Sequence, residues 1–416
     1  MFFLYQIILS FLIIISPLII LFRIIKNKED KKRFLEKFSF FSKRKIKKNL
    51  IWFHCASVGE LMSVIPLVEN YEKKKSIDQI LITTSTLSSS KIIKKFQFKK
   101  TIHQFYPIDH YIFVDKFIKY WKPNLAIFVE SEIWPCMFNK LKKKNIPIIL
   151  LNARITKKTF NRWFLIKKFS YQIFNKIHLA YPQNIESKSF LKKLNIKKIK
   201  YIGNLKFAEN NQITKKNFNE KLKSQFNKKK IWVASSTHIN EELFCAKTHL
   251  ELKKKNKNLL TIIIPRHVHR VEEIKSQLKK LNLKITLHSK KNYNLKNIDI
   301  YIVDTFGETK KFHEIGSSVF FGGSIIKRGG QNPLEAARFG AKILHGSNIE
   351  NFKDVYKLLK ILKISKKVTT PKELASSIIF KKNKNTGIKI KNIGRIILKK
   401  TIKELDYLIN NEYKKT

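Results

Sequence analysis

The chain has 416 residues, with 86 Lys and Arg against 30 Asp and Glu, which gives a formal net charge of +56. This length exceeds what one hydrophobic core usually serves, so we expect about two domains. A composition that is 43% hydrophobic and 12% aromatic excludes global disorder. The charge alone suggests nucleic acid or an anionic membrane as the partner.

Lysine dominates the basic residues, with 76 Lys and only 10 Arg. Arg is the residue that recognises guanine edges and phosphates with two parallel hydrogen bonds. Lysine spread evenly along the chain is more typical of drift toward residues with A+T-rich codons, and we expect no specific nucleic-acid partner. The 12 glycines are clustered instead: eight lie between Gly307 and Gly346, where we expect the backbone to approach a ligand.

A membrane anchor is predicted at the start of the chain. Residues 2–22 form an almost unbroken apolar run, and at about 1.5 Å per residue this run can cross the ~30 Å hydrocarbon core. Six Lys or Arg follow between Arg23 and Arg33 and none precede the run, so we expect a single-pass inner-membrane anchor with the rest of the chain in the cytoplasm. A cleaved signal peptide is the alternative, but it would have a basic start and a shorter apolar core, and the sequence has neither. Because Pro17 interrupts the run, a helix that lies in the membrane interface is an alternative to one that crosses the membrane.

The chain shows no metal-binding pattern. Cys55, Cys136 and Cys245 are far apart and odd in number, and in a cytosolic protein they would stay reduced. His267 and His269 form an isolated pair without further ligands nearby. We therefore expect neither a disulfide nor a metal site.

Two α/β domains follow the anchor, because short apolar runs alternate with longer amphipathic stretches, as in parallel βαβ units. We expect an N-terminal Rossmann-like domain over 23–206 and a C-terminal one over 207–416, facing each other across a cleft, with the polar stretch 207–230 separating them. The predicted strands are 50–54, 79–83, 125–129 and 147–151, then 231–234, 260–264, 298–303, 318–322 and 341–344.

In the first domain, the motif His54–Glu60 follows the first strand. Gly59 would allow a tight turn and Glu60 would open the helix 61–71. A carboxylate at a helix N-terminus tends to stay ionised, as a general base must. From spacing alone, however, Glu60 more simply complements the helix dipole.

Two carboxylates, Glu130 and Glu132, follow the apolar strand 125–129 and stand beside Trp134. Carboxylates among apolar neighbours are costly unless they are used or paired, although one of them could merely cap the next helix. Asn152–Arg154 and Asn204–Lys206 also follow strand-like runs and bring cations to the same edge. A solvated cation is the ordinary interpretation of any single Lys here.

In the second domain, Ser235–His238, Pro265–His267 and Asp304–Glu308 each end a predicted strand with groups that suit a phosphate or nucleotide. The strongest segment is Arg328–Ala337. Asn332 is a good N-cap there, Pro333 suits the first helical position, and Glu335 falls at the third. Glu335 either caps the helix or holds ribose hydroxyls. Nothing matches a P-loop or a dinucleotide fingerprint.

These motifs together resemble the Kdo transferases, which attach 3-deoxy-D-manno-octulosonic acid to lipid A precursors. The motifs are HCASVGE (54–60), ESEIWP (130–135), NAR (152–154), GNLKF (203–207), SSTHINEE (235–242), PRH (265–267), DTFGE (304–308), GGS (322–324) and RGGQNPLEAA (328–337). The chain departs from that family at Gln331, where His is usual, at Phe306, where Met is usual, and in Thr83–Ser89, which lacks the usual Pro and Gly.

The resemblance implies an inverting, metal-independent glycosyltransferase of the GT-B fold that uses CMP-Kdo as donor and lipid IVA as acceptor in lipopolysaccharide biosynthesis. It implies Glu60 as general base, with Glu130 and Lys206 stabilising the transition state. It implies no cofactor, and anionic lipid of the inner membrane as a further partner. Another nucleotide sugar on the same fold is the alternative. The implied CMP-binding residues are Arg266, His267, Phe306, Gly307, Glu308, Asn332, Pro333, Leu334 and Glu335.

Overall fold

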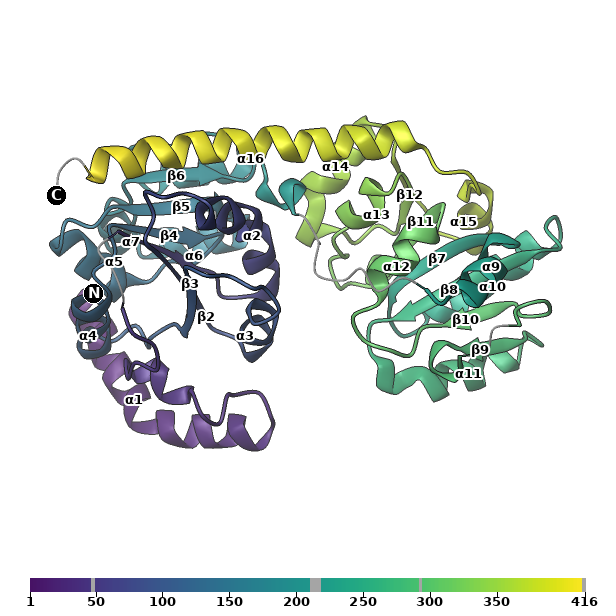
Figure 1. Ribbon diagram of the computed structural model, residues 1–416, viewed down its shortest axis with the longest axis horizontal. Coiled ribbons are helices and arrows are strands. Elements are labelled where there is room, and N and C mark those ends of the chain that lie inside the picture. Colours follow the sequence, from purple (N-terminus) through teal and green to yellow (C-terminus); the bar gives the residue numbers. More distant parts are fainter. Residues whose placement is uncertain (46–48, 210–217, 292–293, 414–416) are drawn as a thin grey trace. The chain divides into compact units, whose positions relative to one another are not determined.

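Two compact units make up the chain in the computed structural model, which describes residues 1–45, 49–209, 218–291 and 294–413 (Figure 1). The first unit comprises Met1–Ile213 and Ile393–Thr416, and the second comprises Thr214–Asn392. Residues from 393 onward thus belong to the first unit, whereas the sequence analysis assigned them to the second domain. Gly394 explains this packing, because a Cβ there would lie 2.1 Å from the carbonyl oxygen of Phe207.

The first unit is built on a six-stranded parallel sheet with strand order β3-β2-β1-β4-β5-β6. Its strands are β1 (Leu50–His54), β2 (Gln79–Thr84), β3 (Thr101–Phe105), β4 (Leu125–Val129), β5 (Ile148–Ala153) and β6 (Leu179–Pro182). Its helices are α1 (Phe2–Ile25), α2 (Val58–Glu72), α3 (Leu87–Ile93), α4 (Tyr111–Trp121), α5 (Pro135–Lys143), α6 (Lys157–Leu165), α7 (Lys167–Phe174) and α8 (Ile185–Lys193), with short 3-10 turns at η1 (Phe34–Phe38) and η2 (Leu205–Ala208).

The second unit holds a seven-stranded parallel sheet with strand order β13-β12-β11-β7-β8-β10-β9. Its strands are β7 (Lys230–Thr237), β8 (Leu259–Pro265), β9 (Ile285–Leu287), β10 (Ile300–Ile302), β11 (Ser318–Phe321), β12 (Lys342–His345) and β13 (Ser365–Lys367). Its helices are α9 (Glu220–Asn227), α10 (Glu241–Lys253), α11 (Val271–Lys279), α12 (Thr309–Ile315), α13 (Leu334–Arg338), α14 (Lys353–Ile361) and α15 (Pro371–Ser377), and α16 (Lys384–Tyr413) begins here.

The nine predicted strands are all present, within three residues of their predicted ends. Four further strands, β3, β6, β9 and β13, were not predicted, and each of them is an edge strand of its sheet. A central parallel strand is buried on both faces and therefore reads as a continuous apolar run. An edge strand needs fewer apolar residues, as the Ser-Lys-Lys of β13 shows. The apolar runs from which the central strands were predicted are therefore missing from the edge strands.

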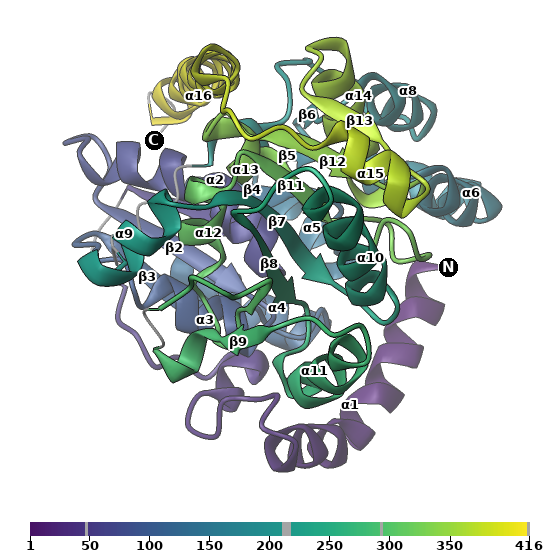
Figure 2. The same ribbon diagram turned by 90° about the vertical axis from the view of Figure 1, so that its right-hand side faces the viewer.

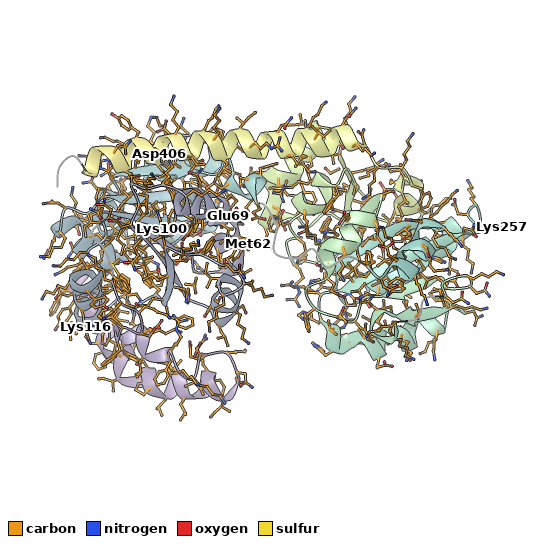
Figure 3. All side chains as sticks on the ribbon, viewed as in Figure 1. Met62, Glu69, Lys100, Lys116, Lys257 and Asp406 are labelled. Atoms are coloured by element: carbon orange, nitrogen blue, oxygen red, sulfur yellow. The ribbon has the colours of Figure 1, made fainter. Side chains whose placement is uncertain are left out.

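Each sheet is covered by helices that bury an apolar core of its own. Trp52 on β1 and Trp121 on α4 are fully buried in the first core, and Trp232 on β7 is fully buried in the second. The lysines lie outside these cores: Figure 3 shows Lys116 projecting from the first unit and Lys257 from the second, and both side chains are exposed. The large positive charge is therefore a surface property of both units.

Helix α1 is the one element among the described residues that is long and apolar enough to cross a membrane, with a mean hydropathy of 2.7. Pro17 lies inside it and cannot donate to the carbonyl of Ile13, but the Ser16 hydroxyl donates to that oxygen at 2.7 Å. The helix bends along its length (Figure 2), which is the usual consequence of an internal proline.

Candidate active site

The first group of predicted site residues lies at the carboxyl edge of the first sheet, where β1 and β4 are neighbours. The order β3-β2-β1-β4-β5-β6 changes direction between these two strands. In open parallel sheets, ligands bind outside the carboxyl ends of the strands at such a switch point. His54 ends β1 and Glu130 follows β4 directly, so the fold places the predicted motifs where a ligand is expected.

Glu60 lies in the first turn of α2 and is held by the residues just before the helix. Its Oε2 accepts a hydrogen bond from the Ala56 N–H at 2.7 Å, and its Oε1 accepts one from the Ser57 hydroxyl at 2.8 Å. The Ser57 oxygen in turn accepts from the Glu60 N–H. This arrangement resembles a capping box, and it places the carboxylate in the first turn of the helix, where it can complement the helix dipole as the simpler interpretation of Glu60 expected. The expected tight turn at Gly59 is wrong, because Gly59 lies within α2 with no positive φ and with room for a Cβ.

The environment of Glu60 also makes it a weak acid near neutrality. Burial, which is the largest cause, and the negative charges of Glu132 and Glu130 together raise its pKa to about 7, against the opposing hydrogen bonds from Ser57 and Ala56. A carboxylate whose pKa lies close to the working pH is well matched to accept and release a proton. The same side chain can therefore cap the helix and act as a base.

Glu130 and Lys206 form a buried ion pair at this edge. Lys206 Nζ lies 2.5 Å from Glu130 Oε1, and the two side chains are only 12% and 9% exposed. Two asparagines position the lysine: Asn152 Oδ1 accepts from the Leu205 N–H at 3.0 Å, and Asn204 Oδ1 accepts from the Lys206 N–H at 3.0 Å. The residue after β4, the end of β5 and the turn η2 are thereby joined around one charge pair.

Glu130 has a left-handed backbone, with φ of 59°. This conformation is uncommon for a residue with a Cβ and indicates a position that the surrounding structure holds in place. The N–H of Glu130 donates to the carbonyl of Leu151, and its carbonyl accepts from the N–H of Arg154. These bonds fix the backbone at the point where the carboxylate must turn toward Lys206.

Glu132, which had no predicted role, has a partner that was not predicted from the sequence. Glu132 Oε2 lies 3.2 Å from His54 Nε2 and accepts from the Trp134 indole N–H at 2.9 Å. On its other side, His54 Nδ1 lies 3.0 Å from Thr83 Oγ1. The chain thus sets a half-buried carboxylate, a buried imidazole and a buried hydroxyl in series near Glu60. Nothing in the two motifs indicated this pairing, because the residues lie 78 positions apart in the chain.

In the second unit, the ends of β7 and β8 gather positive charge. Arg266 and His267 follow β8 and are exposed, and the Arg266 N–H donates to the Thr237 carbonyl at 2.9 Å. Burial lowers the pKa of His238, and the charges of His267, Arg328 and Arg266 lower it further. Three chain segments therefore place cationic side chains close together, which is what an anionic ligand requires.

The loop 304–308 presents an exposed ring beside a well-held carboxylate. Phe306 is 82% exposed and Gly307 adopts a φ of 82°. Glu308 accepts from Lys311 Nζ at 2.6 Å and from the Thr305 hydroxyl at 2.7 Å, and it lies 2.6 Å from His288 Nε2. Burial alone would raise the pKa of Glu308, but these donors and charges hold it at about 2. Glu308 is thus an acceptor at any physiological pH.

A pocket of about 490 Å³ lies elsewhere, in the first unit, and one of about 410 Å³ adjoins the 304–308 loop. The latter is lined by Phe306, Glu308 and His288 together with Phe218, which precedes α9, and Leu222, which lies within it. An aromatic ring, a fixed acceptor and apolar walls can hold a planar base or a sugar.

The segment 332–335 begins helix α13 much as predicted, with its start displaced by one residue. Asn332 Oδ1 accepts from the Leu334 N–H at 3.1 Å, and the helix runs from Leu334, with Pro333 at the cap position. Glu335 Oε1 lies 3.0 Å from His313 Nδ1, and His313 Nε2 lies 2.9 Å from the hydroxyl of Ser235. Glu335 is therefore more than a cap, because it is tied to the end of β7.

The Gly322–Ser324 loop is already occupied by a carboxylate of the chain. The Gly323 N–H donates to Glu241 Oε2 at 2.7 Å, and the Ser324 and Ile325 N–H groups donate to Glu241 Oε1 at 3.2 and 3.0 Å. A Cβ at Gly322 would lie 2.5 Å from the carbonyl oxygen of Ser236. The glycines of this loop serve the packing of β7 against β11, and their N–H groups are not free for a ligand.

Cys55, Cys136 and Cys245 are buried and free. Across the described ranges 1–45, 49–209, 218–291 and 294–413, no group of three or more His, Cys, Asp or Glu side chains could hold a metal ion.

The family described as 3-deoxy-D-manno-octulosonic-acid transferase (kdotransferase) matches residues 32–209. The solved structure of the glycotransferase of kitacinnamycin is similar in fold, with a TM-score of 0.53 at 10% identity, covering 88% of this chain and 100% of the other. With two parallel sheets of Rossmann-like order, this likeness identifies the GT-B type of fold.

Two relatives are similar in sequence over most of the chain. The 3-deoxy-D-manno-octulosonic acid transferase of Rickettsia felis is 34% identical over 344 residues, which are 83% of this chain and 74% of that protein. The enzyme of the same name from Rickettsia bellii is 33% identical over 392 residues, which are 94% and 93% of the two chains. Identity of this extent, over a site built from the motifs described above, shows that the chain belongs to the 3-deoxy-D-manno-octulosonic acid transferase family.

Proposed function

We propose that the chain transfers Kdo from CMP-Kdo to a lipid A precursor, lipid IVA, with inversion at the anomeric carbon, in lipopolysaccharide biosynthesis. The observation that supports this most is the Glu60 carboxylate, which has a pKa of about 7 and lies near the buried Glu130–Lys206 pair at the switch point of the first sheet. Membership of the family supplies the substrates.

In the proposed reaction, Glu60 takes the proton of the acceptor hydroxyl. The hydroxyl oxygen bonds to the anomeric carbon while the bond from that carbon to the CMP phosphate oxygen breaks, and CMP leaves with the electron pair. Attack from the face opposite the leaving group inverts the configuration. The carboxylate of Glu130 stabilises the positive charge that develops on the sugar ring, and the ion pair with Lys206 holds that carboxylate in place.

The second unit would hold the donor. Arg266, with Arg328 nearby, supplies positive charge for the phosphate of the departing CMP, and the exposed His267 ring can donate a hydrogen bond to it, so the proposed reaction needs no metal. Phe306 offers an exposed ring on which the base or sugar can pack. Glu308 and Glu335 are ionised or paired acceptors suited to ribose hydroxyls, and Asn332–Leu334 supply the start of α13.

We further propose that the chain works on the cytoplasmic side of the inner membrane, attached through α1. The acceptor is an acylated, phosphorylated disaccharide that resides in the membrane, and a basic surface next to an apolar helix attracts anionic lipid and phosphate alike. Seven Lys or Arg against three Asp or Glu lie between Arg23 and Lys37, directly after this helix.

The test is transfer of Kdo by the full chain in detergent micelles, with CMP-Kdo and a tetra-acylated lipid A precursor, read by the mass of the product. Glu60→Ala is expected to abolish transfer, whereas Glu69→Ala, on the same helix, is expected to keep it. Addition of EDTA is expected to change nothing. Transfer that survives in Glu60→Ala would refute the proposed base, and transfer that stops in EDTA would refute metal independence.

The alternative donor is tested by protection. If CMP protects the second unit from proteolysis and UDP does not, the donor is a CMP sugar. The reverse result would mean that the chain uses another nucleotide sugar on the same fold.

A further inference from the structure

The start of helix α1 is fastened to the first unit by polar side chains. The Tyr5 hydroxyl donates to Asp109 Oδ2 at 2.9 Å, and one turn further on Ser10 Oγ lies 3.2 Å from His110 Nε2. Asp109 is buried and also accepts from the N–H groups of Cys136 at 3.0 Å and Met137 at 2.9 Å. The group that holds Tyr5 therefore also caps helix α5, and the contact is part of the unit's interior.

The other end of α1 is fastened to the same unit. Arg23, in the last turn, lies 3.0 Å from Glu29 Oε2, and Lys37 Nζ lies 2.6 Å from the same oxygen. Glu29 is buried. A few residues later, Glu36 accepts from the Phe105 N–H at the end of β3 at 2.8 Å. The helix and the segment that follows it are thus held along the carboxyl edge of the first sheet.

These contacts conflict with a helix that stands across a bilayer. Twenty-four residues of α-helix are about 36 Å long, and the hydrocarbon core is ~30 Å thick. If α1 crossed that core, Tyr5 and Ser10 would lie within it or beyond it, out of reach of Asp109 and His110 on the globular unit. A helix held at both ends by one unit must lie along that unit's surface, and the bend of α1 lets it follow that surface (Figure 2).

The outer face of α1 is left without a partner within the chain. The large apolar side chains exposed there are Phe3, Leu4, Ile7, Ile8, Phe11, Leu12, Ile14, Ile15, Leu18, Ile19, Leu21, Phe22 and Ile25. Exposed Tyr111 and Ile112, at the start of α4, follow directly on His110, and exposed Leu35 and Phe40 lie in the segment after α1. So large a continuous apolar surface is covered by a membrane or a protein in proteins that work in water.

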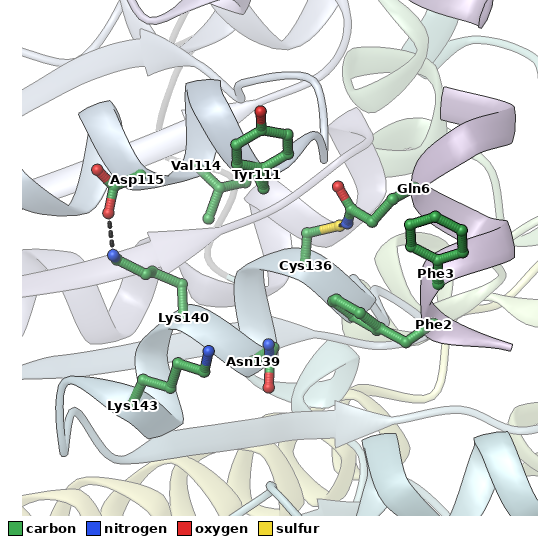
Figure 4. Close-up of a pocket in the computed structure, with 10 residues that line it drawn as sticks. All are labelled: Phe2, Phe3, Gln6, Tyr111, Val114, Asp115, Cys136, Asn139, Lys140 and Lys143. Carbon is green, nitrogen blue, oxygen red and sulfur yellow. Dashed lines mark hydrogen bonds and ion pairs between the residues drawn. The ribbon is translucent and has the colours of Figure 1, made fainter. Parts of the chain in front are cut away.

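The charge around this surface decides between those two partners. The segment 26–32 carries Lys26, Lys28, Lys31 and Lys32 at the end of the helix. At its start, a pocket of about 490 Å³ combines the rings of Phe2 and Phe3 with the amines of Lys140 and Lys143 on α5 (Figure 4). Lys140 is paired with Asp115. Apolar side chains ringed by amines are complementary to a lipid with acyl chains below and a phosphate above.

We propose that α1 lies in the plane of the membrane, with its outer face among the acyl chains of an anionic bilayer and its inner face docked on the first unit, and that it does not span the bilayer. The inference rests on the membrane attachment proposed above and selects its geometry. The carboxyl edge of the first sheet, with Glu60 and Glu130, is then held next to the lipid surface from which the acceptor comes.

The experiment uses the full chain with a protease-cleavable tag ahead of Met1, added to preformed vesicles of phosphatidylcholine with or without phosphatidylglycerol. The chain is expected to bind more tightly to the vesicles that contain phosphatidylglycerol, and protease added outside is expected to remove the tag as completely as it does without vesicles. A tag that is protected until detergent is added would overturn the proposal in favour of a spanning helix. Absence of binding to either vesicle would refute the membrane attachment itself, which the transfer assay in micelles does not depend on.

A variant pair tests the docking independently of the tag. Tyr5→Phe keeps the helix apolar but removes the donor to Asp109, and it is expected to lower the melting temperature of the vesicle-bound chain by a few degrees. Tyr111→Phe, at an exposed tyrosine beside the helix, is the matched control and is expected to change nothing. Adding Asp109→Asn to Tyr5→Phe should give less than the sum of the two single effects. Equal melting temperatures for Tyr5→Phe and the wild type would overturn the docked geometry.

Discussion

The pKa of Glu60 gives a prediction that separates a base from a mere helix cap. The rise from the ordinary value of 4.5 to about 7 corresponds to about 3 kcal/mol against ionisation. If Glu60 is the base, kcat/KM should be constant above about pH 7 and should fall tenfold for each pH unit below it. At pH 5.5 about 3% of the enzyme would hold Glu60 ionised.

Glu132→Gln tests the physical cause of this raised pKa. Burial is the largest cause and the Glu132 charge comes next, so the variant should move the acid limb of kcat/KM down by about one pH unit. Relative to its own plateau, the variant should then be roughly eightfold more active than the wild type at pH 5.5. Gln keeps an oxygen that can accept from the Trp134 indole, so the packing of the site is largely preserved.

The assay is initial-rate transfer from CMP-Kdo to the lipid precursor between pH 5 and 9, in one buffer mixture of constant ionic strength. Glu69→Gln is the matched control, because it removes one negative charge as Glu132→Gln does. Glu69 lies on α2, about 13 Å along the helix from Glu60, and is labelled in Figure 3. An acid limb that stays at the same pH in Glu132→Gln, or that shifts equally in Glu69→Gln, would refute the reasoning.

The raised pKa also acts on stability, with a definite sign. The folded chain keeps the Glu60 proton up to about pH 7, whereas the unfolded chain releases it near pH 4.5. Stability contributed by the protonated group is therefore lost as the pH rises between these values. Glu60→Gln should remove this loss, so its unfolding free energy should exceed that of the wild type by more at pH 8 than at pH 5.

Three further predictions follow from the geometry. Lys206→Met should destabilise the chain by about 3–5 kcal/mol in urea unfolding, because it leaves Glu130 buried without its partner, and adding Glu130→Gln should recover most of this stability without recovering transfer; a Lys206→Met chain as stable as the wild type would contradict the buried pair. Phe306→Ala should leave the melting temperature unchanged, because the ring is 82% exposed, but should raise KM for CMP-Kdo about tenfold, and an unchanged KM would remove Phe306 from the donor site. Gly322→Ala should unfold the second unit, as measured by circular dichroism, because its Cβ would lie 2.5 Å from the Ser236 carbonyl oxygen. Gly59→Ala has open space around its Cβ and should fold, with a melting temperature at or above that of the wild type.

Much of the site was predictable because its residues come directly after buried strands. His54 ends β1, Glu130 follows β4 and Arg266 follows β8, and apolar runs of this kind are the clearest signal a sequence offers. The parallel strands of one sheet bring their carboxyl ends to the same edge, so the motifs of each unit lie together at the edge of that unit's own sheet. The predicted turn at Gly59 was wrong because the residues around a glycine do not show whether it lies in a turn or in the first turn of a helix.

The partners of these residues could not be predicted, because they are set by contacts between distant segments. His54 and Glu132 are 78 positions apart, and nothing in either motif indicates that they touch. Glu241 accepts hydrogen bonds from N–H groups of the Gly322–Ser324 loop, although it lies 82 positions earlier in the chain than Gly323. A loop whose composition is typical of an anion site therefore binds a side chain of its own protein.

The amino-acid sequence by itself determined the class of fold, the central strands, the family motifs and the presence of one helix apolar enough for a membrane, because each of these depends on local composition and periodicity. Only the tertiary structure decided which unit contains residues 393–416, which charges are paired, how far the pKa of Glu60 is raised, and that both ends of α1 are fastened to one unit. Buried side chains and ion pairs arise when segments far apart in the chain come together, so the hydrophobicity pattern along the chain does not predict them.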